Sequence, residues 1–146
     1  MADTPHLEPL LTQPLPDDLG VQAFLDGVAR AFTAGDGEAV AALWETPALV
    51  LSDDMDEVID TRGEIADFFG GARAQYNQLD IVDTKAEIVR LDELNDRLVC
   101  VRVRWPYLDR QGREVGAECS TYTLKRGGDA KWKIRVAVMH GQEALN

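Results

Sequence analysis

The chain has 146 residues, 45% of them hydrophobic, and a formal net charge of −11. This length predicts one domain with an apolar core that needs no disulfide or metal, and the negative charge argues against a nucleic-acid partner. Because no run of about 18 apolar residues marks a membrane span and the N-terminus lacks the basic start of a signal peptide, we expect no membrane contact and a cytoplasmic location.

A proline-rich N-terminal arm, residues 1–18, is expected to precede a domain that spans residues 19–146. Prolines recur at positions 5, 9, 14 and 16, a spacing that neither a helix nor an inner strand tolerates. Leucines lie between these prolines and favour at least partial docking of the arm on the domain.

The next part of the chain predicts three helices. Apolar residues three or four apart indicate a first helix from a cap at Asp17 or Asp18 to Gly35. Asp36 caps a second helix, which Pro47 stops. The expected buried side of this second helix consists of Val40, Leu43 and Trp44.

Thr61 and Glu64 have the spacing of a capping box, which starts a third helix that runs to about Tyr76. Aromatic residues dominate its apolar face: Ile65, Phe68, Phe69, Ala72 and Tyr76. Before this helix, two short strands at 48–51 and 58–59 flank an acidic turn. The turn lacks the glycine and the distal glutamate of a calcium loop, so we expect it to be solvated.

Four longer strands are expected at residues 85–91, 97–107, 114–124 and 132–140. Helices followed by hairpin-linked strands predict an α+β fold with the helices on one face of an antiparallel sheet. Alternation along each strand selects the side chains that face the helices. In the second strand they are Val99, Val101, Val103, Trp105 and Tyr107. In the fourth strand they are Trp132, Ile134, Val136, Val138 and His140.

The third long strand is assigned through its hairpin. A tight turn at residues 109–112 would place Val101 opposite Ser120 and Val99 opposite Tyr122. The inward side chains would then be Glu118, Ser120, Tyr122 and Leu124, whereas a bulge would reverse the assignment. Polar groups among aromatic walls are typical of a small-molecule site.

His140 and Glu118 are the candidate catalytic residues. A neutral histidine at the end of the last strand could act as a general base, with Glu118 as its carboxylate neighbour. Both alternatives stay open: His140 can be a structural histidine, and Glu118 can face outward and pair with an arginine across the strands. The predicted small-molecule-binding residues are Trp44, Ser52, Trp105, Ser120 and Tyr122.

No metal or other cofactor is expected. The two histidines stand at opposite ends of the chain, and neither Cys100 nor Cys119 belongs to a CxxC motif. The cysteines are interpreted as small apolar groups, since a disulfide would require the strands to place them opposite each other.

Four motifs follow one another in a familiar order: Ala34-Gly35-Asp36, Leu43-Trp44, Arg62-Gly63-Glu64-Ile65 with Phe68-Phe69, and Trp132-Lys133-Ile134. With this order and spacing, residues 19–141 resemble the nuclear-transport-factor-2-like superfamily, in particular its SnoaL-like and ketosteroid-isomerase-like branches. The resemblance implies a cone-shaped α+β barrel of the cystatin-like type, in which three helices pack on a curved sheet around an open pocket.

The resemblance also implies a homodimer that forms through the outer face of the sheet. Four basic residues are expected on that face: Arg102, Arg104, Lys133 and Arg135. They would either meet an acidic stretch of a second subunit or simply be the solvated side of the sheet.

Function does not transfer with a fold. The ketosteroid isomerase pattern implies a tyrosine donor, a carboxylate base and a protonated aspartic acid, but Val28, Ser52 and Ser120 stand at these positions, with Asp53 one residue from the base. We therefore expect a pocket for a small hydrophobic metabolite, with any lyase- or isomerase-like chemistry carried by other residues.

The alternative function is a non-catalytic dimerisation domain with a filled cavity. In that case large side chains would occupy the interior, namely Trp44, Trp105, Phe68 and Phe69. The volume of the cavity discriminates between the two functions, because ligand sites typically have about 300 Å³ or more.

Overall fold

The computed structural model describes residues 19–143. The predicted N-terminal arm and the helix cap predicted at Asp17 or Asp18 lie outside the described residues. No helix of the described part is long and apolar enough to cross a membrane.

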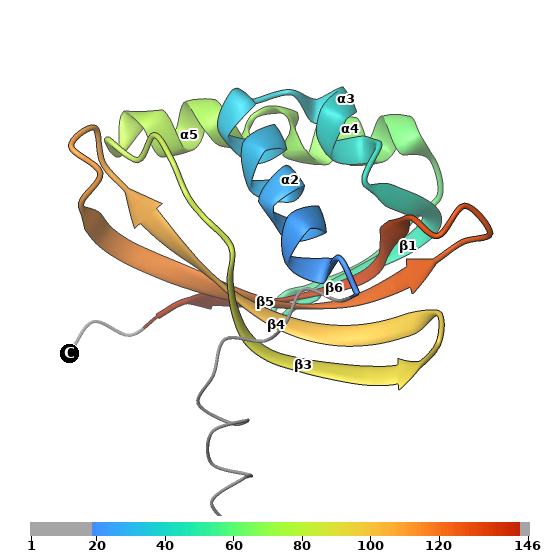
Figure 1. Ribbon diagram of the computed structural model, residues 1–146. Helices are drawn as coiled ribbons and strands as arrows, with labels where there is room; N and C mark the ends of the chain where they lie inside the picture. The colour runs from blue at the N-terminus through green and yellow to red at the C-terminus, as the bar shows by residue number, and fades with distance from the viewer. Residues whose placement is uncertain (1–18, 144–146) are drawn as a thin grey trace, which may run out of the picture.

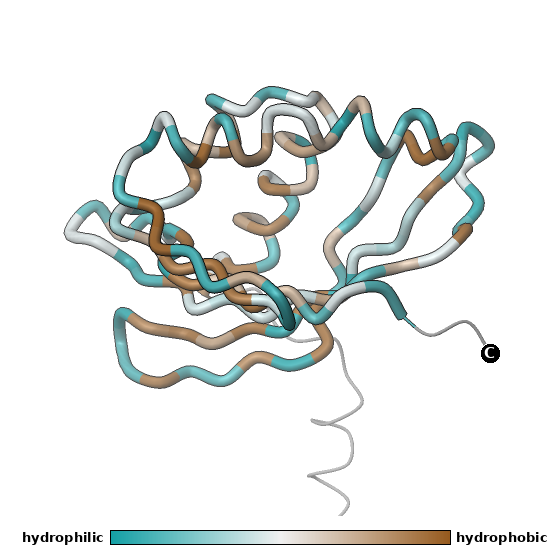
Figure 2. The backbone as a smooth tube through the Cα atoms, turned by 180° about the vertical axis from the view of Figure 1, so that it is seen from behind, coloured by the Kyte–Doolittle hydropathy of each residue, from teal (hydrophilic) through white to brown (hydrophobic). Residues whose placement is uncertain are grey.

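Helix α2 (Val21–Ala34) lies across the concave face of a curved sheet (Figure 1). Hydrophobic residues recur along this helix and along the strands beneath it (Figure 2), and Leu25 and Val28 are completely buried. The helix ends at Gly35, whose φ of 68° lies in the left-handed region. A Cβ atom on Gly35 would come within 2.4 Å of the Cδ atom of Arg73, so glycine also permits this close approach.

The second predicted helix is shorter than expected. Helix α3 (Gly37–Ala41) starts after Asp36, whose side chain accepts a hydrogen bond from the backbone N–H of Ala39 at 3.1 Å. Strand β1 (Trp44–Ser52) then begins at Trp44, which the sequence pattern placed on the helix. Pro47 lies within β1 and follows a cis peptide bond. Pairing of β1 with strands on both sides outweighs the local helical pattern.

The third predicted helix is divided in two. Helices α4 (Arg62–Gly70) and α5 (Ala72–Gln78) are separated by Gly71. The predicted capping box is confirmed: Thr61 Oγ1 accepts from the N–H of Glu64 at 3.2 Å, and Glu64 Oε1 accepts from the N–H of Thr61 at 3.1 Å.

Six strands of the described residues form one sheet in the order β2-β1-β6-β5-β4-β3. The remaining strands are β2 (Met55–Ile59), β3 (Glu87–Asn95), β4 (Leu98–Leu108), β5 (Glu114–Arg126) and β6 (Trp132–Gln142). Neighbours are antiparallel except β1 and β6, which are parallel. The helices cover one face of the curved sheet (Figure 1), which confirms the predicted α+β fold.

The register between β4 and β5 differs from the prediction by two residues, since Val101 lies opposite Tyr122 rather than Ser120. The loop from 109 to 113 is longer than the expected tight turn, and a bulge leaves Val115 without a partner on β4. A shift of two residues keeps every side chain on its face of the sheet. Glu118 therefore points toward the helices, and so do Ser120 and Tyr122.

Strand β6 departs from simple alternation. Leu124 pairs with Ile134 and Thr123 pairs with Val136, so Arg135 is an extra residue that reverses the faces after Ile134. Ala137 is consequently buried, and Val138 lies on the outer face. The prediction that Val136, Val138 and His140 share the inward face with Trp132 is therefore wrong.

Cys100 and Cys119 are both free and half-buried. Cys100 lies opposite Thr123, and Cys119 lies opposite Arg104, so the sheet register does not bring the two thiols together.

Candidate functional site

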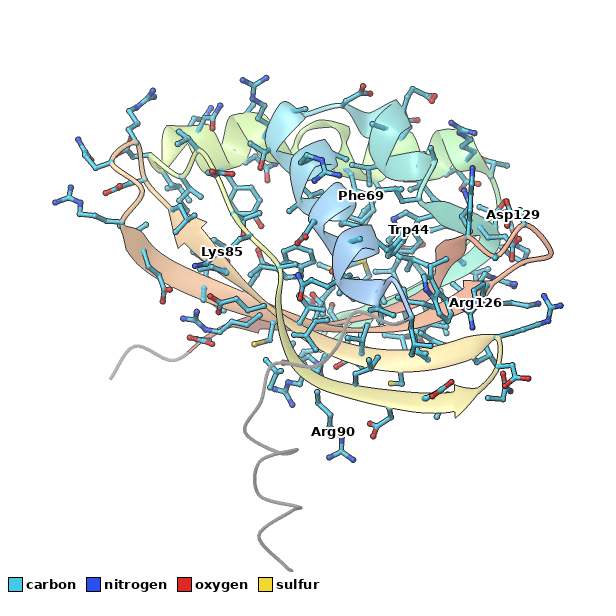
Figure 3. The ribbon with its side chains drawn as sticks, in the orientation of Figure 1. Trp44, Phe69, Lys85, Arg90, Arg126 and Asp129 are labelled. Carbon is cyan, nitrogen blue, oxygen red and sulfur yellow. The ribbon has the colours of Figure 1, made fainter. Side chains whose placement is uncertain are left out.

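A cavity of about 140 Å³ lies between the helices and the inward face of the sheet. Its apolar walls are aromatic. The ring centroid of Phe69 lies 5.5 Å from that of Phe32 and 5.5 Å from that of Trp44. Trp105 extends this wall, at 5.8 Å from Phe32. Figure 3 shows Phe69 and Trp44 between the helical layer and the sheet, and both predicted tryptophans, Trp44 and Trp105, line the cavity.

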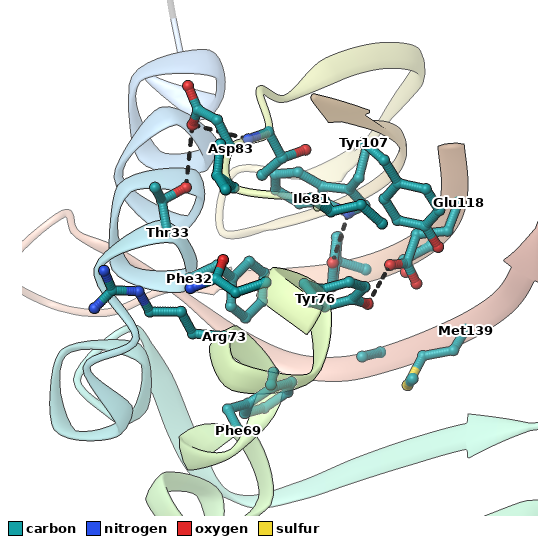
Figure 4. A pocket seen from close by; sticks show the side chains of 18 of the residues that line it. Phe32, Thr33, Phe69, Arg73, Tyr76, Ile81, Asp83, Tyr107, Glu118 and Met139 are labelled. Carbon is teal, nitrogen blue, oxygen red and sulfur yellow. Dashed lines mark hydrogen bonds between the residues drawn. The ribbon is translucent and has the colours of Figure 1, made fainter. Parts of the chain in front are cut away.

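One end of the cavity carries a carboxylate. Glu118 of β5 is half-buried, and the hydroxyl group of Tyr76 donates to its Oε1 atom at 2.6 Å. Tyr107 of β4 packs beside Tyr76 with a ring-centroid distance of 5.7 Å. Figure 4 shows the three side chains gathered at this end of the pocket. Of the two alternatives for Glu118, the inward one is therefore correct.

Burial keeps the phenols of the cavity protonated. It raises the pKa of Tyr76, and the hydrogen bond to Glu118 and the charge of this carboxylate raise it further. The pKa of Tyr107 is raised by the same causes, burial first. Burial also raises the pKa of Tyr122 to about 12, even though Ser120 and Trp105 hydrogen-bond to its hydroxyl group. Phenols are protonated at neutral pH and can donate hydrogen bonds, and the raised pKa values extend this state to alkaline pH.

A second polar pair lies deeper in the core. The indole N–H of Trp105 donates to the hydroxyl oxygen of Tyr122 at 3.0 Å, and both side chains are buried. The indole N–H of Trp44 is also buried, but it has no hydrogen-bond partner within residues 19–143. Such orphaned donors are uncommon in folded proteins.

Charged side chains other than Glu118 lie at the edge of the cavity. Asp83 accepts hydrogen bonds from the Thr33 hydroxyl at 3.2 Å and from the N–H of Thr84 at 2.8 Å. Arg73 donates to the carbonyl oxygen of Ala34 at 3.2 Å, and in Figure 4 its guanidinium group points away from Glu118. None of the ion pairs within the described residues includes Glu118.

Two predicted site residues lie elsewhere. His140 is exposed on the outer face, where its Nε2 atom is 2.7 Å from the hydroxyl of Thr121, because the bulges in β6 turn it away from the helices. Ser52 lies at the end of β1, where the chain turns into β2, and its hydroxyl donates to Asp54 at 3.0 Å. Neither side chain lines the cavity, whereas Ser120 does.

The sequence reasoning missed Tyr76 and Tyr107 as site residues. The sequence pattern placed both side chains on inward faces. This could have identified them as site residues, because the hydroxyl group of a buried tyrosine needs a hydrogen-bond partner. Met139 lines the cavity as well, but only the β6 bulge turns it inward, and the alternation pattern gave no sign of this. In the described part of the chain, no group of three or more histidine, cysteine, aspartate and glutamate side chains could hold a metal ion.

Comparison with known proteins supports this architecture. A family model described as NTF2-like protein (DUF6841) matches residues 17–142. No curated protein matches the chain in sequence.

Solved structures with the same fold are distant in sequence. A domain of unknown function with a cystatin-like fold from Nostoc punctiforme has 19% identity and a TM-score of 0.67, with 91% of this chain and 82% of that chain covered. A putative calcium/calmodulin-dependent protein kinase II association domain from Xanthomonas campestris has 20% identity and a TM-score of 0.62, with 91% and 95% covered. A ketosteroid isomerase-like protein from Erwinia carotovora has 14% identity and a TM-score of 0.63, with 90% and 100% covered.

Proposed function

The chain belongs to the family of NTF2-like proteins designated DUF6841, and we propose that its cavity binds a small hydrophobic metabolite whose polar end reaches Glu118. The match to this family model confirms the predicted nuclear-transport-factor-2-like superfamily. One observation carries the proposal: a half-buried carboxylate, held by a tyrosine hydroxyl, stands in a cavity whose other walls are aromatic. Apolar walls with a few convergent polar groups are typical of ligand sites.

The size of the cavity limits the ligand. Its volume of about 140 Å³ falls below the roughly 300 Å³ given above as the mark of a ligand site, so the volume does not support a site for a drug-sized molecule. An engineered apolar cavity of about 150 Å³ in another protein nevertheless binds benzene. The volume therefore favours a ligand with one ring or a short branched chain.

The polar end of the cavity could also support proton transfer. A carboxylate offers about four acceptor positions, so the hydrogen bonds from Tyr76 and Tyr107 leave some of those on Glu118 free. Glu118 could take a proton from a bound molecule, while a protonated tyrosine donates to an oxygen atom that gains charge. This would be lyase- or isomerase-like chemistry, and it uses none of the three positions that the ketosteroid isomerase pattern requires.

Native mass spectrometry of the purified protein, compared with its denatured mass, tests the proposal. We expect a small co-purifying molecule that is lost in Glu118→Gln and retained in Glu93→Gln, which removes an equal charge from an exposed position on β3. If no molecule co-purifies, a library of one-ring compounds can be screened through the fluorescence of Trp44 and Trp105. Binding that is equal in both variants would contradict a role for Glu118, and the absence of any binder would contradict the pocket.

The outer face of the sheet supports a second proposal, a homodimer. Leu49 lies between Val58 and Val136 across three strands, and Leu51 lies beside Val138. These apolar side chains are half-buried or exposed, and within residues 19–143 the helices cover only the opposite face of the sheet. Association does not require a filled cavity, and Phe68, one of the predicted filling residues, is 40% exposed.

A further inference from the structure

The cavity holds an excess negative charge at the end where Glu118 lies. Glu118 is half-buried, and its hydrogen-bond partners are the neutral hydroxyl groups of Tyr76, at 2.6 Å, and Tyr107. No lysine, arginine or histidine of residues 19–143 forms an ion pair with it. Carboxylates that are shielded from water are usually paired with a positive group.

The remaining walls favour a positive ligand as well. Seven aromatic side chains line the cavity: Phe32, Trp44, Phe69, Tyr76, Trp105, Tyr107 and Tyr122. The face of an aromatic ring attracts a cation, and the attraction is larger where water is excluded. A carboxylate surrounded by aromatic rings is therefore complementary to an ammonium group that carries apolar substituents.

The edge of the cavity does not offset this preference. Arg73 and Asp83 carry opposite charges there, and the guanidinium group of Arg73 points away from Glu118 (Figure 4). The whole chain has a net charge of −11, which attracts cations and repels anions over a longer range.

We infer that the cavity takes a small organic cation, an amine or ammonium compound with one ring or a short branched chain, whose nitrogen contacts Glu118 and the tyrosine rings. This inference rests on the proposed function, because it specifies the ligand class of the same cavity. The ammonium group would donate to the free acceptor positions of Glu118, and the apolar part would lie against Phe32, Phe69 and the tryptophans.

Three probes of nearly equal shape test the inference: benzylamine, which is charged at pH 7, neutral benzyl alcohol and anionic benzoate. Their binding to the full chain is measured through the fluorescence of Trp44 and Trp105 and by isothermal titration calorimetry. We expect benzylamine to bind at least about tenfold more tightly than benzyl alcohol, with benzoate the weakest. In Glu118→Gln the preference for benzylamine should disappear, and in Glu93→Gln it should persist.

The outcomes separate the inference from the proposed function. If benzyl alcohol or benzoate binds as tightly as benzylamine, the inference that the ligand is an organic cation is overturned, and the cavity remains a ligand site. A preference for benzylamine that survives in Glu118→Gln overturns the role of this carboxylate in selecting a cation. If none of the three probes binds, both the ligand class and the proposed pocket are overturned.

Discussion

Glu118 and the three tyrosines of the chain depend on one another. Tyr76, Tyr107 and Tyr122 are all the tyrosines that the sequence contains, and all three line the cavity. The negative charge of Glu118 raises the pKa of each phenol, after burial as the first cause. The neutral hydroxyl of Tyr76 in turn gives the carboxylate a hydrogen bond that water would otherwise supply.

Alkaline titration should reveal this coupling. Each folded-state pKa is raised above the ordinary value of 10.0, and that of Tyr122 reaches about 12. We expect little tyrosinate absorbance in the folded protein near pH 11, where the phenols of an unfolded chain are mostly ionised. The stability that the neutral phenols contribute is fully present below pH 10 and is lost as the pH rises toward the folded-state values.

The measurement is a spectrophotometric titration near 295 nm, with far-ultraviolet circular dichroism recorded at each pH. Tyr122→Phe is the matched variant, and it should remove one late-titrating phenol. Ionisation of all three phenols around pH 10 in a chain that remains folded would contradict the cavity geometry.

At the scale of single residues, the sequence predicted part of the site. The inward positions of Trp105, Ser120 and Tyr122 were predicted correctly. In β4 and β5, inward and outward side chains alternate without a bulge along the part of each strand that lines the cavity. His140 was misplaced because a bulge does not change the apolar pattern: Val136 and Val138 are as apolar as residues that truly face inward. Ser52 was assigned through its position in the ketosteroid isomerase pattern, but its hydroxyl group donates to Asp54 in the turn between β1 and β2, away from the cavity.

The contact between α3 and α4 depends on a glycine. A Cβ atom on Gly37 would lie 2.5 Å from the carbonyl oxygen of Ala66, which is backbone and cannot move aside easily. We expect Gly37→Ala to lower the free energy of unfolding by about 1–3 kcal/mol, as overpacking usually does. Urea denaturation followed by circular dichroism measures the change.

Gly70→Ala is the control for this variant. Gly70 ends α4, and nothing lies within 4 Å of the position that its Cβ would take. The replacement should be neutral or stabilise by up to about 1 kcal/mol, because alanine has the higher helix propensity. Equal effects of the two substitutions would show that α3 and α4 do not approach this closely in solution.

The capping box of α4 offers a separate test. Thr61→Ala removes the oxygen atom that accepts from the N–H of Glu64, and we expect a loss of about 1 kcal/mol in the free energy of unfolding. Thr61→Ser keeps that oxygen and should retain most of the stability. A loss that is the same in both variants would indicate that the methyl group, rather than the cap, is responsible.

Local signals and tertiary pairing explain which elements could be predicted. The capping box at Thr61 and the four long strands are encoded by residues that are adjacent or regularly alternating, and both were found. Strand β1 was mistaken in part for a helix because Leu43 and Trp44 continue a helical spacing, while its pairing with β6 joins residues about 90 positions apart. Periodicity within a short window contains no information about such a partner.

At the scale of the whole molecule, the chain itself neutralises half of the basic residues expected on the outer face. Arg104 forms ion pairs with Glu87, Glu114 and Glu143, and it thereby lowers the pKa of both Glu114 and Glu143. Arg135 pairs with Glu45 at 3.1 Å. From the sequence, the four basic residues of this face were expected either to meet a second subunit or to be solvated. Neither expectation describes all four, because acidic residues of the same chain pair with two of them.

The exposed Arg102 and the apolar residues beside these ion pairs determine what the outer face could bind. Arg102 is absent from the ion pairs of the described residues, so its charge is available to a partner. A second copy of this acidic chain could supply carboxylates to Arg102, and aliphatic side chains could form the centre of the interface. This arrangement favours a homodimer over a partner that is itself basic.

Substitution at the centre of this face tests the homodimer. Val138→Glu places a charge beside Leu51 on the outer face, where burial against a second copy would desolvate it. We expect the unmodified protein to elute as a dimer in size-exclusion chromatography with light scattering, and Val138→Glu as a folded monomer. Leu79→Glu is the control, since Leu79 is 67% exposed at the end of α5 in the helical layer, and it should leave the dimer intact. A monomeric unmodified protein, or a dimer that tolerates Val138→Glu, would contradict association through the outer face.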